Sequence, residues 1–218
     1  MKEENKNGQS PEKEQLLSSL RNAEEMYVFM SLCTKMPYVL CDEETFDDEV
    51  LLYYTEEDAQ REGKKLIEQR IPIQIAKIEK KQLLGFFSSL YPMGVNGLLI
   101  NNNMESEARL QLGELVIRPN TEDLPDGKVW VENPQLHLTA LYFMQEMRRQ
   151  EKPELTEELK GLQEEILVNY GRGRFIVAVH KENGMPMLKQ KNGDAYQPIF
   201  TDILEFRKFN KEDQFKTM

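Results

Sequence analysis

Met36-Pro37-Tyr38-Val39-Leu40 returns later in the chain as Met185-Pro186-Met187-Leu188-Lys189. The similarity continues on both sides of this stretch, upstream without a gap and downstream once three residues are dropped from the turn. The flanking segments that match are 27–30 with 176–179 and 52–56 with 198–202. A repeat of this length predicts a duplicated structural unit, so it decides the expected fold. It does not indicate any chemistry.

The repeat divides the chain into four regions. Residues 1–10 are hydrophilic and predict a disordered tail. A first lobe is expected over 11–103, a hairpin and connecting helix over 104–153, and a second lobe over 154–218. We therefore expect an α+β fold of two related tandem lobes, each a small mixed sheet flanked by helices.

The second lobe is expected to be truncated, because nothing in it matches the helix at 79–91 or the strand at 97–101 of the first. A half-built lobe would leave apolar faces uncovered. Three explanations remain open. The chain is a shortened form of a longer protein, or residues 104–131 complete the lobe, or a second molecule does.

Local signals predict the individual elements. Thr55-Glu56-Glu57-Asp58 resembles a capping box, so a helix should begin after Thr55. The alternation of Ile71, Ile73 and Ile75 is typical of a strand. Strands are also expected at 110–117 and 128–131. In the second copy we expect strands at 175–180, 187–189 and 195–200, followed by a helix headed by Thr201.

The composition limits the function. The chain has 218 residues, 39% of them hydrophobic, and a formal net charge of −10. This balance argues against binding to nucleic acid or to an anionic membrane, and it would suit a basic protein partner. No segment is apolar over the length of a membrane span, and the N-terminus lacks the apolar run of a signal peptide. Two cysteines, Cys33 and Cys41, indicate a reducing compartment, so the cytoplasm is expected.

The order of the motifs resembles that of the SseB family, named for enhanced serine sensitivity in bacteria. The shared pattern is a strand pair and an aromatic-Thr helix start, then a helix, a strand, a helix and a closing strand. Here the helix starts are Tyr54-Thr55 and Pro198-Ile199-Phe200-Thr201-Asp202, and the closing strand is Gly97-Leu98-Leu99-Ile100-Asn101. The resemblance covers about residues 12–103 and again 154–218. It implies a cytoplasmic bacterial protein whose biochemical activity is not established, and it transfers no catalytic residue.

No constellation typical of an enzyme is found in the sequence. Cys41 precedes three acids that would raise its pKa, and neither cysteine is followed by a short anion-binding turn with an arginine. The two histidines, His137 and His180, belong to no zinc motif. Gly171-Arg172-Gly173-Arg174 lacks a Walker lysine, and the acidic loop 42–49 does not follow EF-hand spacing. We therefore expect no catalytic residue, no cofactor and no metal.

Polar residues follow several predicted strands. Thr55, Asn101, Asn102 and Thr201 stand at such strand ends, where side chains often face a cleft. They are the predicted residues of a ligand or partner cleft. The alternative is structural, since Thr caps helices and Asn tolerates left-handed turns.

Three functions are compatible with the sequence. The first is a non-enzymatic protein-binding or regulatory module of the SseB kind, with a protein partner of unknown identity or a homodimer. The second is a small-molecule sensor, for example of an amino acid. The third is an unrecognised enzyme, which would need a deep pocket with paired titratable groups.

Overall fold

The computed structural model describes residues 11–118, 124–125, 127–150, 154–182 and 184–218. The predicted tail 1–10 lies outside them. The fold is α+β, as expected, and the chain divides into two compact units. Unit 1 comprises Met1–Ser88 and Asn96–Arg118, and unit 2 comprises Ser89–Val95 and Pro119–Met218. Among the described residues, no helix is long and apolar enough to cross a membrane.

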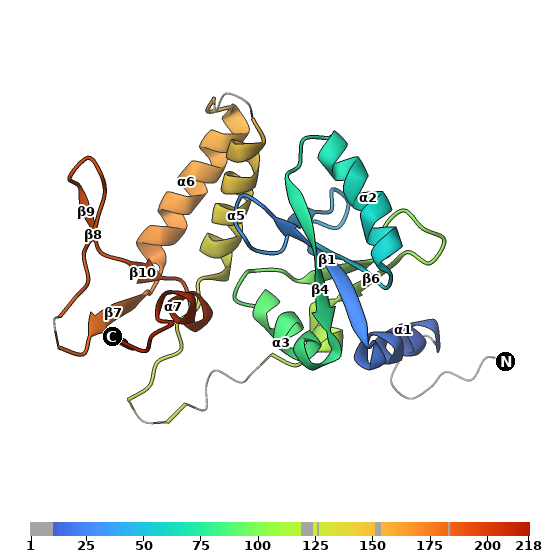
Figure 1. Cartoon of the computed structure of the whole chain (residues 1–218), viewed down its shortest axis with the longest axis horizontal. Helices are drawn as coiled ribbons and strands as arrows, with labels where there is room; N and C mark the ends of the chain where they lie inside the picture. Colours follow the sequence, from blue (N-terminus) through green and yellow to red (C-terminus); the bar gives the residue numbers. More distant parts are fainter. Residues whose placement is uncertain (1–10, 119–123, 126, 151–153, 183) are drawn as a thin grey trace. The chain divides into compact units, whose positions relative to one another are not determined.

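Unit 1 is built on one mixed sheet with strand order β4-β1-β3-β5-β6, with β2 paired to β3 (Figure 1). Strands β3 and β5 run parallel and the other pairs are antiparallel. The strands are β1 (Glu25–Ser31), β2 (Val39–Cys41), β3 (Asp48–Tyr53), β4 (Ile73–Glu79), β5 (Gly97–Ile100) and β6 (Ala108–Gln111). The helices of this part are α1 (Pro11–Asn22), α2 (Glu56–Glu68), α3 (Lys80–Leu90), which crosses the unit boundary, and α4 (Leu112–Leu115).

The central strands of this sheet are buried on both faces. Strand β5 is buried at every position, and β3 at all but its first. Such strands read as continuous apolar runs because each face packs against other elements. On one face α2 contributes to a core cluster of Tyr27, Phe29, Leu51, Tyr53, Ala59, Ile71, Ile73 and Leu99. Gly63 lets α2 approach closely, since a Cβ there would lie 3.2 Å from the Phe29 ring.

The segment after β5 departs from the expected hairpin. The predicted strand 110–117 ends at Gln111, and the chain turns at once into the short helix α4. The Leu112 N–H donates to the Asn96 carbonyl at 2.7 Å, and the helical turn buries both Leu112 and Leu115. Residues 128–131 form no strand, and Val129 is exposed. The strand prediction was wrong after Gln111 because Leu112 and Leu115 are three residues apart, which is the spacing that one helical turn buries. The strand prediction at 128–131 was also wrong.

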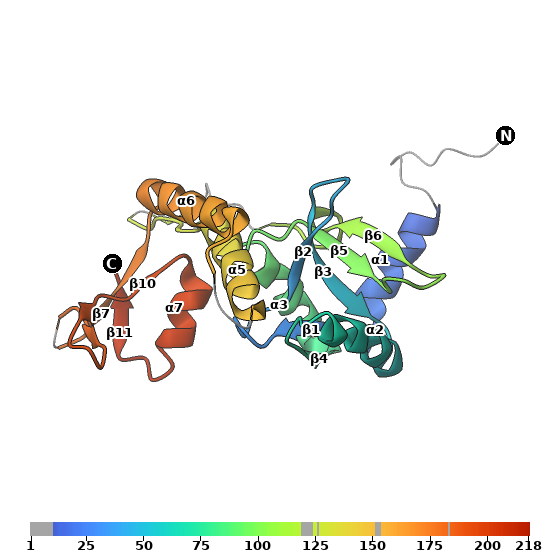
Figure 2. The same cartoon turned by 90° about the horizontal axis from the view of Figure 1, so that it is seen from above.

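Unit 2 combines a helical hairpin with a small sheet (Figure 2). Helices α5 (Pro134–Arg149) and α6 (Glu157–Arg172) pack together. The sheet has the order β10-β7-β11, and β8 and β9 form a separate hairpin. These strands are β7 (Ile176–His180), β8 (Leu188–Lys189), β9 (Ala195–Tyr196), β10 (Ile199–Phe200) and β11 (Phe215–Thr217), with α7 (Ile203–Phe209) after β10.

Two details of the second copy differ from expectation. The predicted strand 195–200 is broken into β9 and β10, because Pro198 has no N–H to donate to a ladder. The cap of α7 is Asp202 and not Thr201. Its carboxylate accepts from the Leu204 and Glu205 N–H groups at 2.8 and 3.1 Å. A carboxylate caps as well as a hydroxyl does, so the sequence alone did not choose between these neighbours.

The strand order β10-β7-β11 is the same as the order β3-β1-β4 in unit 1. A helix also follows β10 as α2 follows β3. The duplication itself stays a prediction. The two sheets differ in how far their faces are covered by other parts of the chain. In unit 2 the core cluster of Ile176, Ala178 and Phe206 lies on one face, whereas Ile199 on the other face is 39% exposed.

Candidate functional site

Three of the predicted cleft residues lie in unit 1, where their contacts are those of a cap and a turn. The Thr55 hydroxyl accepts from the Asp58 N–H at 3.2 Å, which confirms the cap of α2. Asn101 has a φ of 51° and is buried. Its N–H donates to the Leu52 carbonyl and its Oδ1 accepts from the Tyr54 N–H, so it joins the ends of β3 and β5. Asn102 follows it and is half-buried.

Thr201 lies in unit 2. Its carbonyl accepts from the Asn133 amide at 3.0 Å, and its hydroxyl donates to Asp202 at 2.8 Å. The contacts described for Thr55, Asn101 and Thr201 are made with the backbone or with a neighbouring side chain. A single cleft formed by all four residues stays a prediction.

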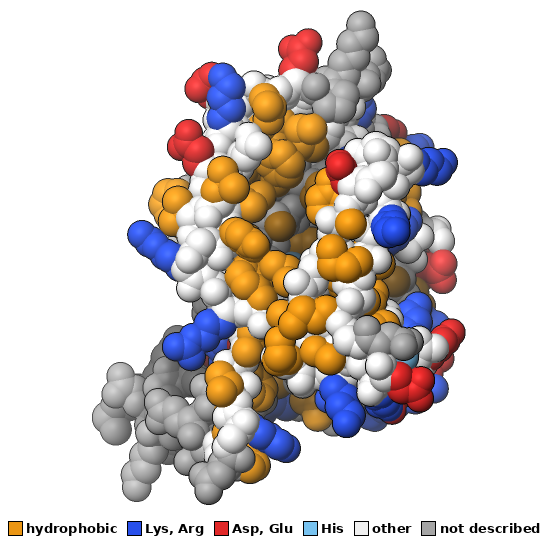
Figure 3. Space-filling view, turned by 90° about the vertical axis from the view of Figure 1, so that its left-hand side faces the viewer, with side chains coloured by type: hydrophobic (Ala, Val, Ile, Leu, Met, Phe, Trp, Pro, Cys, Tyr) orange, Lys and Arg blue, Asp and Glu red, His pale blue; other side chains and the backbone are white. Residues whose placement is uncertain are grey.

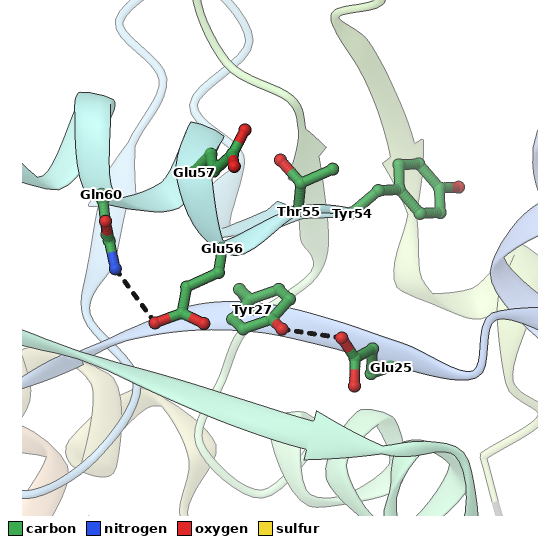
Figure 4. A pocket seen from close by; sticks show the side chains of 7 residues that line it. All are labelled: Glu25, Tyr27, Tyr54, Thr55, Glu56, Glu57 and Gln60. Atoms are coloured by element: carbon green, nitrogen blue, oxygen red, sulfur yellow. Dashed lines mark hydrogen bonds between the residues drawn. The ribbon is translucent and has the colours of Figure 1, made fainter.

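A shallow pocket of about 510 Å³ adjoins Thr55. It is lined by Glu25, Tyr27, Tyr54, Thr55, Glu56, Glu57 and Gln60 (Figure 4). The Tyr27 hydroxyl donates to Glu25 at 2.7 Å, and the Gln60 amide donates to Glu56 at 3.0 Å. Tyr27 and then Lys77 lower the pKa of Glu25. The pocket therefore holds carboxylates that favour a cationic group, and Thr55 is the predicted site residue on its wall.

Glu49 is a buried acid of unit 1, and its side chain is 2% exposed. Its Oε1 lies 3.4 Å from the Arg109 guanidinium, and its Oε2 has no hydrogen-bond partner. Burial raises the pKa of this carboxyl, and Arg109 opposes that shift. Nearby, partial burial and then the acid Asp48 raise the pKa of Cys41, as the sequence predicted for its acidic neighbours. A raised pKa leaves the thiol protonated, so Cys41 is not an activated nucleophile.

Unit 2 exposes a broad apolar surface on the side shown in Figure 3, where hydrophobic side chains form two ridges with a hollow between them. In β7 the side chains of Ile176 and Ala178 point into the core, so Val177 and Val179 point to the opposite face. Ile199 pairs with Val177 and shares that face. We use the name apolar face of unit 2 for its apolar residues on α6, β7, β10 and the β8–β9 hairpin region that are exposed or half-buried: Leu167, Tyr170, Phe175, Val177, Val179, Met185, Met187, Leu188, Tyr196 and Ile199.

The apolar face is larger than scattered surface residues would produce. On α6, Leu167 is 63% exposed and Tyr170 is 52% exposed. In the hairpin formed by β8 and β9 and its flanking residues, Met187 is 52% exposed and Tyr196 is 49% exposed. The Tyr170 ring packs against Phe175 with centroids 5.2 Å apart, which joins the helix to the sheet. Contiguous exposed apolar surface of this kind marks interaction sites.

A group of possible metal ligands was missed by the sequence reasoning. His137, Asp202 and Glu205 each offer a ligand atom, and these atoms lie within 4.8 Å of one another. In the sequence His137 belongs to no zinc motif, and Asp202 is part of the helix-start motif. Asp202 and Glu205 are close in the sequence at the start of α7, but His137 lies far from them on α5, so no spacing rule joins it to the two acids. The signal in the sequence was that His137 and Asp202 each lie near the start of a predicted helix.

Comparisons with known proteins add little. No family model and no curated protein matches the chain. Among solved structures it is similar to Tic22 from Plasmodium falciparum, with 16% sequence identity, a TM-score of 0.26, and coverage of 93% of this chain and 80% of that chain. A similarity at this TM-score carries no argument about fold or function.

Proposed function

We propose that the chain is a non-enzymatic protein-binding module, and that the apolar face of unit 2 receives an amphipathic helix of a partner protein. The observation that carries the proposal is that the sheet β10-β7-β11 bears apolar side chains on both faces, while its second face remains partly exposed. Burying one Val, Leu or Ile side chain is worth about 1.5–3 kcal/mol, so covering this face would supply substantial binding free energy.

A helix is the occupant that unit 2 itself indicates. On the covered face, α7 packs Ile203 and Phe206 against Ile176 and Ala178. In unit 1, the corresponding strands β1 and β3 are buried on both faces, whereas the corresponding edge strand β4 leaves Gln74 and Lys77 exposed. A helix satisfies its own backbone hydrogen bonds, so it can lie across an apolar sheet and bury only its apolar stripe.

The net charge of the chain indicates the sign of the partner. On α6 itself the exposed charges are mixed, with the acids Glu157, Glu158 and Glu164 and the bases Lys160 and Arg172. The whole chain carries a net charge of −10. Complementary charge speeds encounter and selects partners, so the occupant should carry Lys or Arg beside its apolar stripe.

The test uses a labelled peptide of leucine and lysine arranged as an amphipathic helix, with a scrambled peptide and a leucine–glutamate version as comparisons. We expect the full chain to bind the first peptide more tightly than the other two. The double variant Leu167→Glu/Ile199→Glu should weaken binding by about 10- to 100-fold, because it removes two apolar contacts. Fluorescence anisotropy measures the change.

Ile67→Glu is the matched control, since Ile67 is an exposed apolar residue on α2 in unit 1. It should leave binding unchanged. Equal binding of the scrambled peptide, or an undiminished affinity in the double variant, would overturn the proposal. A wild-type dimer in sedimentation that the double variant abolishes would also overturn it, because a second copy would then be the occupant.

A second candidate function is a sensor of a small molecule that carries an ammonium group, such as an amino acid. The acid-lined pocket beside Thr55 favours it. A ligand that binds the native state must raise the melting temperature. We expect serine or a related amine to raise it in the wild type and less in Glu56→Gln, with Glu164→Gln as the control. No shift over a full concentration series rejects this candidate.

The expected location and family belong to the proposal as well. Neither Cys33 nor Cys41 forms a disulfide, and reduced cysteines are typical of the cytoplasm. Membership of the SseB family stays a prediction and names no partner.

A further inference from the structure

We infer that His137, Asp202 and Glu205 form a site for a divalent transition-metal ion, with zinc as the best match. His137 lies in the first turn of α5, Asp202 is the cap of α7, and Glu205 lies in the first turn of α7. All three belong to unit 2. An ion there would join α5 to α7.

The geometry between His137 and Asp202 is the main argument. His137 Nδ1 is buried and has no hydrogen-bond partner, although it lies 3.4 Å from Asp202 Oδ2. The two atoms are close enough for a charged contact, but their separation exceeds the usual length of a hydrogen bond. Two ligands bound tetrahedrally to zinc at 2.0–2.1 Å lie about 3.3–3.4 Å apart. The separation therefore matches that of two ligands of one ion.

The donor set is appropriate for zinc. One imidazole nitrogen and two carboxylate oxygens make three protein ligands, and zinc sites of that size keep a fourth position for water. Calcium requires six to eight oxygen ligands, and magnesium retains several waters, so both suit this set less well. Because the side chain of His137 is only 10% exposed, its unpartnered nitrogen would gain a strong interaction on binding.

Neighbouring groups already hold the acids in position. The Thr201 hydroxyl donates to Asp202 Oδ2, and two N–H groups of α7 donate to Oδ1. Such contacts orient a metal ligand. Lys208 Nζ lies 2.6 Å from Glu205 Oε1, so an ion would compete with an exposed lysine for this carboxylate.

The test starts from the full chain after treatment with a chelator. Zinc chloride is titrated by calorimetry, the melting temperature is followed, and Co²⁺ replaces zinc to report tetrahedral coordination by visible absorption. We expect one ion per chain and a higher melting temperature, since the ion binds the folded state. Glu205→Gln and His137→Asn should each weaken binding by about 10-fold or more, and His180→Asn and Glu212→Gln should not.

Asp202 is left unchanged because it also caps α7. If His137→Asn fails to fold, Glu205→Gln alone decides the result, because its side chain is only half-buried. The inference is overturned if the wild type binds no zinc. It is also overturned if Glu205→Gln binds zinc as tightly as the wild type, which would place the ion elsewhere, for example on a free cysteine.

Discussion

Replacing Gly94 by alanine will lower the free energy of unfolding of unit 2 by about 2–5 kcal/mol. Gly94 has a φ of +87°, and a left-handed backbone costs a residue with a Cβ about 1–2 kcal/mol. A Cβ at this position would also lie 2.7 Å from the Pro134 carbonyl oxygen and 2.9 Å from Leu138 Cβ. These atoms belong to the backbone and base of α5, so they cannot rotate away, and overpacking adds about 1–3 kcal/mol.

Urea unfolding followed by tryptophan fluorescence measures this loss, because Trp130 is the sole tryptophan and lies in unit 2. Substitutions at two other glycines separate the cost of the left-handed backbone from the cost of the close contact with α5. Gly193 has a φ of +94° but open space around it, so Gly193→Ala should cost about 1–2 kcal/mol from the backbone alone. Gly161 lies in α6 with open space, so Gly161→Ala should stabilise by about 0.5–1 kcal/mol. Equal effects for Gly94 and Gly193 would contradict the close approach to α5.

Replacing Phe29 by alanine will destabilise unit 1 by about 3–5 kcal/mol. Phe29 is 1% exposed in the middle of β1, and its ring lies 5.2 Å from that of Tyr53. The substitution removes the aromatic pair and leaves a cavity under α2. Hydrogen exchange of the β1 and β3 amides, together with urea unfolding by circular dichroism, measures the loss.

The double variant Phe29→Ala/Gly63→Ala tests the packing directly. The methyl group that Gly63→Ala adds would project into the space left by the Phe29 ring, so it should restore about 1 kcal/mol, in part through better helix propensity. The control is Phe46→Ala, because Phe46 is 76% exposed in a loop and its loss should change stability by less than about 0.5 kcal/mol. A loss for Phe46 comparable to that for Phe29 would mean that the core assignment is wrong.

Local signals predicted the regular elements of unit 1 well. The repeated segment 27–30 lies in β1, the predicted closing strand 97–101 became β5, and the Thr55 cap began α2 where expected. The helix predicted at 79–91 is α3, Lys80–Leu90. Each of these depends on residues close together in the sequence, so propensity, capping and periodicity suffice to predict it.

The same local signals did not predict the candidate sites. Thr55 was singled out for a cleft, and the structure shows it as a cap that also lines an acidic pocket. The apolar face of unit 2 combines α6, β7 and the hairpin arm, and each of these segments alone looks like an ordinary amphipathic element. Exposure is a property of the packed molecule, so the sequence could not show which apolar residues remain outside.

The sequence by itself determined the fold class, the position of most helices and strands, and the net charge. Only the tertiary structure decided which faces are covered and which distant side chains meet, as His137 and Asp202 do at 3.4 Å. The physical reason is that secondary structure follows from neighbours along the chain. A site follows from contacts between residues that the chain brings together only when it folds.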